Sequence, residues 1–323
     1  MPAITMRQAI SDALWEEMER DEKVFIMGEE VGVWGGTYAV TKGFYDHFGE
    51  KRVRDAPIAE AVIVGAGIGA ALVGLRPISE LMTINFAFVA MDHIVNEAPK
   101  LHAMFGGQMK VPLVIRAVSG GGRQLGATHS QTPDAIFAHF PGLTVIAPGT
   151  PADAKGLLKS AIRSDNPVLF IENALLYQAR GEVPEGEHLV PIGESKVQRE
   201  GSDVTLVSYS SMLQTSLKAA EQLEKEGISV EVVDLRCLRP LDMGPVVESF
   251  KKTNRAVIAE EGWGSYGVGS EVATRLYEEA FDYVDAPIKR VNQQEVPLPY
   301  NRALEHSALP QLADVVAAVK EVL

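Results

Sequence analysis

The sequence is poor in cysteine and has no long apolar run. Its single cysteine, Cys237, excludes an internal disulfide framework and any zinc site built from several cysteines. The longest uncharged run, residues 61–75, is shorter than the roughly 20 residues of a membrane helix and contains four glycines. The first residues show no basic segment followed by an apolar one, so no targeting signal is expected. These features predict a cytoplasmic protein that does not bind membranes.

Positive charge is also scarce. The chain has 30 Lys and Arg residues against 43 Asp and Glu residues, a formal net charge of −13. Such a surplus of negative charge repels phosphate backbones, so a nucleic-acid partner is not expected. Hydrophobic residues make up 46% and charged residues 23% of the chain, values that are ordinary for globular proteins and argue against disorder.

Several catalytic motifs are missing as well. The sequence has no phosphate-binding loop that ends in Gly-Lys-Ser/Thr, no zinc-binding His-Glu-x-x-His and no nucleophile elbow, and its seven histidines lack metal-pair spacing. Residues 65–70, Gly-Ala-Gly-Ile-Gly-Ala, match the Gly-x-Gly-x-x-Ala pattern of dinucleotide binders. That pattern binds nucleotides only in the turn after a strand. Here it lies inside an apolar run, which favours a helix with a tightly packed small-residue face over a nicotinamide-binding oxidoreductase.

Strand and helix patterns alternate along the whole chain. Apolar runs such as residues 24–27 and 111–118 alternate with helical periodicity over residues 61–75, 87–104 and 152–163. This alternation predicts an α/β fold with mostly parallel sheets flanked by helices. Proline, glycine and charge interrupt the pattern before residue 203, so we expect a first domain over residues 1–185, a linker over 186–202 and a second domain over 203–323.

Three features of the first domain could line one crevice. Glu29 follows a predicted buried strand, Glu60 stands at the start of the apolar helix, and Phe86 follows the next strand. Binding sites in open α/β sheets form beyond the carboxyl ends of the strands. Each residue alone also has an ordinary interpretation: a surface acid, a helix N-terminal charge and a core aromatic residue.

Five motifs carry a resemblance to a known family: GEEV (28–31), APIAE (56–60), LMTINF (81–86), HSQ (129–131) and LRPLD (238–242). With them, the chain resembles the beta subunits of 2-oxo acid dehydrogenases, which use thiamin diphosphate. The resemblance implies a transketolase-like pyrimidine-binding domain followed by a transketolase C-terminal-like domain. The motifs GWGSYGVGSE (262–271) and PLPYN (297–301) are more similar to the pyruvate enzymes than to the branched-chain enzymes.

The resemblance implies roles for five residues. Glu60 matches the family glutamate that hydrogen-bonds the N1′ atom of the cofactor's aminopyrimidine and so activates the cofactor. Phe86 matches the aromatic residue that stacks on this ring, and Met82 and Glu29 match cofactor-binding neighbours. His129 matches a second catalytic residue, which contacts the substrate or the reaction intermediate.

A structural potassium ion is implied in the same way. Leu113, Ala161, Ile162 and Asn166 fall where family members hold this ion, largely through backbone carbonyl oxygens. Ser164 stands where relatives often have an acid, which is a departure from the family pattern at this site.

The partners also follow from the resemblance. Thiamin-diphosphate enzymes anchor Mg²⁺ and the diphosphate with a Gly-Asp-Gly motif, which this chain lacks. The family therefore implies an alpha subunit that holds Mg²⁺, an α2β2 heterotetramer, and a lipoyl acyltransferase core that accepts the acetyl group made from pyruvate. Branched-chain 2-oxo acid and acetoin dehydrogenases are the enzymatic alternatives, and a non-catalytic assembly module is the alternative from another class.

Overall fold

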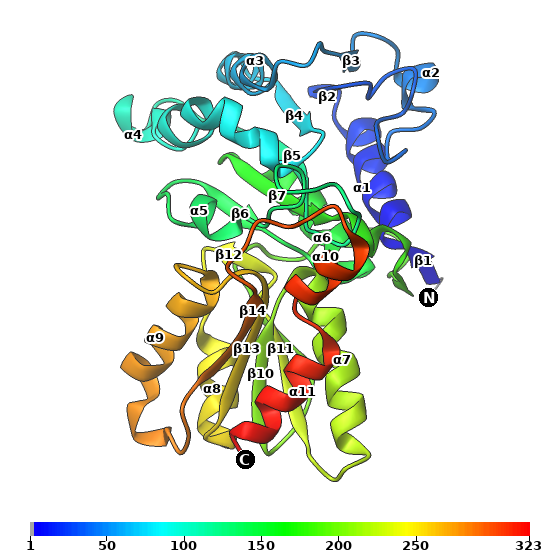
Figure 1. The fold of residues 1–323 in the computed structure, drawn as a ribbon. Coiled ribbons are helices and arrows are strands. Elements are labelled where there is room, and N and C mark those ends of the chain that lie inside the picture. The colour runs from blue at the N-terminus through cyan, green and yellow to red at the C-terminus, as the bar shows by residue number, and fades with distance from the viewer. Residues whose placement is uncertain (1–2) are drawn as a thin grey trace. The chain divides into compact units, whose positions relative to one another are not determined.

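The structure, a computed structural model, describes residues 3–323 and divides the chain into two compact units (Figure 1). The N-terminal unit comprises the residues up to Ser119 together with Ile136–Ile192, and the C-terminal unit comprises Gly120–Ala135 and Gly193–Leu323. Within residues 3–323, no helix is long and apolar enough to cross a membrane.

Strands and helices alternate in both units. In chain order, the strands are β1 (Ala3–Thr5), β2 (Val24–Gly28), β3 (Val53–Asp55), β4 (Arg76–Leu81), β5 (Val114–Ser119), β6 (Thr144–Ile146), β7 (Val168–Asn173), β8 (Arg180–Glu182), β9 (Lys196–Arg199), β10 (Val204–Ser208), β11 (Val230–Asp234), β12 (Cys237–Arg239), β13 (Ala256–Trp263) and β14 (Lys289–Gln293). The α-helices are α1 (Met6–Arg20), α2 (Phe44–Phe48), α3 (Glu60–Leu72), α4 (Leu101–Met104), α5 (Asp134–Ala138), α6 (Pro151–Arg163), α7 (Ser210–Glu224), α8 (Gly244–Thr253), α9 (Val268–Ala280), α10 (Arg302–Ala308) and α11 (Leu312–Glu321). The 3₁₀-helices are η1 (Ile84–Ala90), η3 (Ala174–Gln178) and η4 (Phe281–Tyr283), and η2 (His93–Glu97) is a π-helix.

The N-terminal unit is built on a parallel sheet. Its strands lie in the order β6-β7-β5-β4-β2-β3, and every neighbouring pair is parallel. All residues of the central strands β5 and β7 are buried, which explains their nearly continuous apolar sequences. The predicted α/β class is confirmed in this unit.

Helix α3 begins at Glu60, one residue before the predicted helical run over residues 61–75, and α1 begins at a side-chain cap. The Thr5 hydroxyl caps α1 by accepting a hydrogen bond from the Gln8 amide at 3.2 Å. Helix α3 contains the glycine pattern, so these glycines do not form the strand-to-helix turn that a dinucleotide needs. A Cβ atom on Gly67 would lie 2.5 Å from Ser79 Oγ, so this glycine packs tightly against β4 as predicted, whereas Gly69 is exposed.

The single helix predicted over residues 87–104 is wrong. The structure has instead the 3₁₀-helix η1, the π-helix η2 and the short α-helix α4. Pro99 lies between η2 and α4 and has no backbone N–H, so it cannot donate the hydrogen bond that would continue an α-helix through this point. The apolar periodicity of this segment indicated which face is buried, but it did not predict the type of helix.

The C-terminal unit has its own sheet, in the order β14-β13-β10-β11-β9. All neighbouring pairs are parallel except β9 with β11, which is antiparallel. Residues of β10, β11 and β13 share one hydrophobic core with α7 and α11. Strand β9 lies within the segment predicted as a linker, and the predicted domain limits at residues 185 and 203 stay a prediction.

Candidate active site

The carboxyl ends of three neighbouring strands carry the acidic and aromatic motifs of the N-terminal unit. Strand β2 lies between β3 and β4, and Gly28 is level with both Asp55 and Glu80. Glu29 follows β2 directly, and Met82 follows β4 directly. The three features that the sequence predicted at one sheet edge therefore emerge from adjacent strands.

Backbone hydrogen bonds fix the turn that carries Glu29. The Ala56 amide donates to the Gly28 carbonyl at 2.8 Å, and the Gly32 amide donates to Asp55 Oδ1 at 2.7 Å. Gly28 cannot be replaced easily, because a Cβ atom there would lie 2.6 Å from the backbone oxygen of Glu80. These contacts hold Glu29 against the ends of β3 and β4.

Glu60 is the first residue of α3 and is only 5% exposed. The residue before it, Ala59, provides no side-chain cap, so the first N–H groups of α3 have no capping side chain. The helix dipole favours a negative charge at this end. The structure thus places a buried carboxyl group at an apolar helix N-terminus, as the sequence predicted.

Glu29 is electrostatically coupled to Glu60. Burial raises the pKa of the Glu29 carboxyl, and the negative charges of Glu60 and Glu30 raise it further. Glu29 is 5% exposed, and its Oε1 atom has no hydrogen-bond partner among the described residues. A buried acceptor without a donor marks a place where another group can bind.

Phe86 and Met82 are half-buried and flank the start of η1. The Thr83 hydroxyl donates to the Val118 carbonyl at 3.1 Å, accepts from Asn85 Nδ2 at 2.6 Å and caps η1. The Phe86 amide donates to the Thr83 carbonyl at 3.1 Å. Because η1 also packs against α3, this network holds Phe86 in the same layer as Glu60.

His129 lies in the C-terminal unit, within the irregular segment after β5. Its side chain is exposed, and Nδ1 is 3.0 Å from the Thr128 hydroxyl. The structure describes the two units separately, so a shared site for His129 and Glu60 stays a prediction.

Three of the residues predicted to hold potassium have carbonyl oxygens that already accept hydrogen bonds. The Leu113 and Ala161 oxygens accept amide hydrogen bonds at 2.8 and 3.1 Å, and the Ile162 oxygen accepts from Arg76 Nε at 2.8 Å. These three residues are buried, whereas Asn166 is exposed. A carbonyl oxygen has two lone pairs, so each of the three could still bind a cation beside its present partner.

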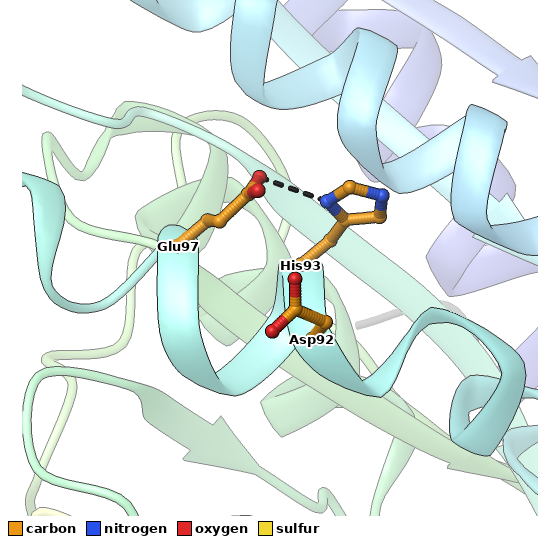
Figure 2. A group of neighbouring side chains, drawn as sticks. All are labelled: Asp92, His93 and Glu97. Carbon is orange, nitrogen blue, oxygen red and sulfur yellow. Dashed lines mark hydrogen bonds and ion pairs between the residues drawn. The ribbon is translucent and has the colours of Figure 1, made fainter.

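Figure 2 shows the one group of possible metal ligands found among residues 3–323, formed by Asp92, His93 and Glu97. His93 Nδ1 lies 2.8 Å from Glu97 Oε2, and Asp92 Oδ1 accepts from Asn96 Nδ2 at 2.7 Å. The histidine ring also packs against α3 at Gly65. His93 and Glu97 pair with each other and Asp92 pairs with Asn96, so we assign no metal to them.

The C-terminal unit also contains a buried carboxyl group that no sequence motif indicated. Asp134 is 1% exposed, and neither carboxylate oxygen has a hydrogen-bond partner among the described residues. Burial raises the pKa of Asp134 to about 8, and the negative charges of Glu261 and Glu260 contribute to the rise. Asp134 is therefore mostly protonated at neutral pH.

Substitution of Asp134 by asparagine is expected to raise stability at alkaline pH. Because the folded pKa exceeds the unfolded value, the aspartate loses stability as the pH rises from about 4 to about 8. Asparagine has the same shape and no charge, so the variant does not lose stability over this pH range. Its Tm should exceed the Tm of the wild type by a few degrees at pH 8, and the two Tm values should be similar near pH 4. Thermal unfolding at both pH values checks this, and a lower Tm of the variant at pH 8 would contradict it.

Both units of this chain are similar to known proteins. The family described as "Transketolase, pyrimidine binding domain" matches residues 2–179, and "Transketolase, C-terminal domain" matches residues 193–315. The pyruvate dehydrogenase E1 component subunit beta of Rickettsia felis is 51% identical over 319 residues, covering 99% of this chain and 98% of that protein. The mitochondrial subunit of Dictyostelium discoideum is 50% identical over 99% of this chain and 91% of that protein.

A solved structure agrees with these relatives. A split-gene transketolase, described as an inactive beta4 tetramer, superposes with a TM-score of 0.81 and 29% identity over 99% of this chain and 98% of that chain. The matched regions cover both sheets and all the motifs described above. The chain therefore belongs to the pyruvate dehydrogenase E1 beta subunit family, whose transketolase-type pyrimidine-binding and C-terminal domains it carries.

Proposed function

We propose that this chain is the beta subunit of a thiamin-diphosphate-dependent pyruvate dehydrogenase, which decarboxylates pyruvate oxidatively and transfers the acetyl group to a lipoyl domain. The observation that carries the proposal is the buried Glu60 carboxyl group at the start of α3, coupled to Glu29. The names of relatives at about half identity over nearly the whole chain support the substrate. A cytoplasmic location remains a prediction.

The residues present fit the pyrimidine half of thiamin diphosphate. When bound, this cofactor supplies a nucleophilic carbon for the 2-oxo group of pyruvate. Glu60 would hydrogen-bond the N1′ atom of the pyrimidine and exchange a proton with it, and the dry surroundings strengthen that bond. Phe86 would stack on the ring with Met82 beside it. The unpartnered Oε1 of Glu29 fits a further polar contact in the same site.

A second chain must complete the site. This sequence lacks the Gly-Asp-Gly motif for Mg²⁺ and diphosphate, so an alpha subunit would hold the metal in an α2β2 heterotetramer. Helix α3 supports a protein contact, because Val62, Ala66, Gly69 and Val73 form an exposed uncharged stripe at helical spacing. Such small and apolar residues let another helix approach closely.

His129 is proposed as the residue of the C-terminal unit that contacts the substrate or the intermediate. The acetyl group would then pass to the lipoyl acyltransferase core of the complex, and the net charge of −13 favours a basic partner domain there. Branched-chain 2-oxo acid and acetoin dehydrogenases are the alternatives, because they require the same carboxyl chemistry at Glu60.

A structural potassium ion is proposed at Leu113, Ala161, Ile162 and Asn166. If K⁺ binds the folded state there, 100 mM KCl should raise Tm by a few degrees relative to 100 mM choline chloride. Equal Tm values in the two salts would contradict the site. The Ile162 carbonyl would bind the ion beside the Arg76 guanidinium, from which it already accepts a hydrogen bond.

The function is tested with the chain co-expressed with its alpha partner, thiamin diphosphate and Mg²⁺. Reduction of an artificial electron acceptor is measured with pyruvate, a branched-chain 2-oxo acid and acetoin. The proposal expects the highest kcat/KM with pyruvate. A preference for either of the other substrates in a well-assembled pair would replace the substrate assignment and keep the cofactor assignment.

A further inference from the structure

The segment that carries His129 has no regular secondary structure of its own. We call residues Gly120–Gln131 the histidine loop; its backbone has positive φ at Gly120, Gly122, Gln124 and Gly126. Within it, the Gly120 amide donates to the Gln131 carbonyl at 3.4 Å, and the His129 amide donates to the Gly126 carbonyl at 3.3 Å. These two long bonds leave most of the loop to be fixed from outside.

Two buried carboxylates of the C-terminal unit bind the backbone of this loop. Glu305, which is 2% exposed, accepts from the Gly122 amide at 3.0 Å and from the Gln124 amide at 2.9 Å. Glu261 accepts from the Gly121 amide at 2.7 Å and from the Thr132 hydroxyl at 3.2 Å. Hydrogen bonds to a charged acceptor are about twice as strong as neutral ones.

Close packing fixes the loop against the segment that bears Glu305. A Cβ atom on Gly121 would lie 2.6 Å from Leu298 Cδ1. A Cβ atom on Gly126 would lie 2.6 Å from Tyr300 Cζ and 2.7 Å from its Cε1 atom. Gly126 has a φ of +79°, so a side chain there would strain the backbone, and both glycines bring the loop close to the side chains of Leu298 and Tyr300.

We propose that Glu305, assisted by Glu261, is a positioning residue that holds His129 in place for the reaction. The inference rests on the proposed role of His129. Glu305 binds two amides on the N-terminal side of Gly126, and Gly126 accepts the hydrogen bond of the His129 amide. Because the backbone is already fixed at these atoms, His129 does not have to be ordered again in each turnover. A displacement of about 1 Å at a catalytic group costs up to about 100-fold in rate.

The test uses Glu305→Gln in the complex assembled with the alpha partner. The amide puts a donor where an acceptor is required, so kcat with pyruvate should fall by about 100-fold while thiamin diphosphate still binds. Glu295→Gln is the matched control: Glu295 is exposed and accepts the Ser265 amide at 2.9 Å, outside the histidine loop, so its kcat should not change.

A double-mutant cycle with His129→Ala distinguishes positioning from general damage. If Glu305 acts through His129, Glu305→Gln should lower kcat by less than about threefold in the His129→Ala background. An equal loss in both backgrounds, or a wild-type kcat in Glu305→Gln, would overturn the inference. An unchanged kcat in His129→Ala alone would instead overturn the proposed role of His129.

A second variant keeps the inference testable if Glu305→Gln does not fold. Gly126→Ala leaves both carboxylates in place and pushes the loop away from the Tyr300 ring. It should reproduce the loss of kcat, again only when His129 is present. Hydrogen exchange should be faster at the Gly122 and Gln124 amides in Glu305→Gln, and unchanged exchange at these amides would count against the inference.

Discussion

Replacement of Glu60 by glutamine is expected to lower pyruvate-dependent turnover of the assembled enzyme by about 10³-fold. Glutamine matches glutamate in size and keeps one acceptor oxygen, but it cannot exchange a proton. Since Glu60 is buried at the start of α3, water cannot easily substitute for its carboxyl group. Steady-state rates with saturating thiamin diphosphate and Mg²⁺ measure the loss.

Two further variants define what the loss means. Glu60→Asp keeps a carboxyl group that can exchange a proton, but its side chain is one methylene shorter. A large loss of turnover in this variant shows that the position of the carboxyl group matters. Glu50→Gln is the control, since Glu50 is an exposed glutamate of the same unit. A loss of less than about tenfold in Glu60→Gln, with the complex intact, would remove Glu60 from the chemistry.

Substitution of Arg116 by methionine is expected to lower the free energy of unfolding by about 3–5 kcal/mol. Arg116 is 2% exposed on β5 and donates to both oxygens of Glu172 at 2.7 and 3.0 Å and to Glu80. Tyr177 donates to the Glu172 carboxylate as well, at 2.6 Å. Without the guanidinium, the buried carboxylate of Glu172 and the partly buried carboxylate of Glu80 would lose their shared cation.

Electrostatics support this expectation. Burial lowers the pKa of the Arg116 guanidinium, but the carboxylates of Glu172 and Glu80 outweigh burial and raise the pKa above its usual value. Urea unfolding of the chain gives the change in free energy. The exposed Arg54 on β3 supplies the control Arg54→Met, which should change stability by less than about 0.5 kcal/mol. An Arg116→Met variant as stable as the control would contradict the account.

The sequence predicted where Glu29, Glu60 and Phe86 lie relative to the strands and helices of the N-terminal unit, because strand ends are local features. Glu29, Glu60 and Phe86 each follow or begin a segment whose apolar pattern is plain, and parallel strands bring their carboxyl ends to one edge. The glycines of α3 were interpreted correctly for the same reason, since their surroundings were helical rather than strand-turn-helix.

Contacts between distant parts of the chain could not be predicted. Glu305 binds the Gln124 amide across 181 residues, and no local pattern distinguishes Glu305 from other glutamates. Arg116 did leave a signal, as the one charged residue of strand β5, which lies beside Glu80 of β4 in the sheet. A charge in a strand that is otherwise fully apolar predicts a buried partner on a neighbouring strand.

In the proposed enzyme, this chain supplies only the pyrimidine half of a shared thiamin-diphosphate site. Equilibrium titration of thiamin diphosphate with Mg²⁺ tests it most directly, with this chain alone and with the pair formed by co-expression with the alpha subunit. The account predicts saturable binding by the pair, accompanied by pyruvate turnover, and neither binding nor turnover by this chain alone. Tight binding and turnover by the isolated chain would contradict it.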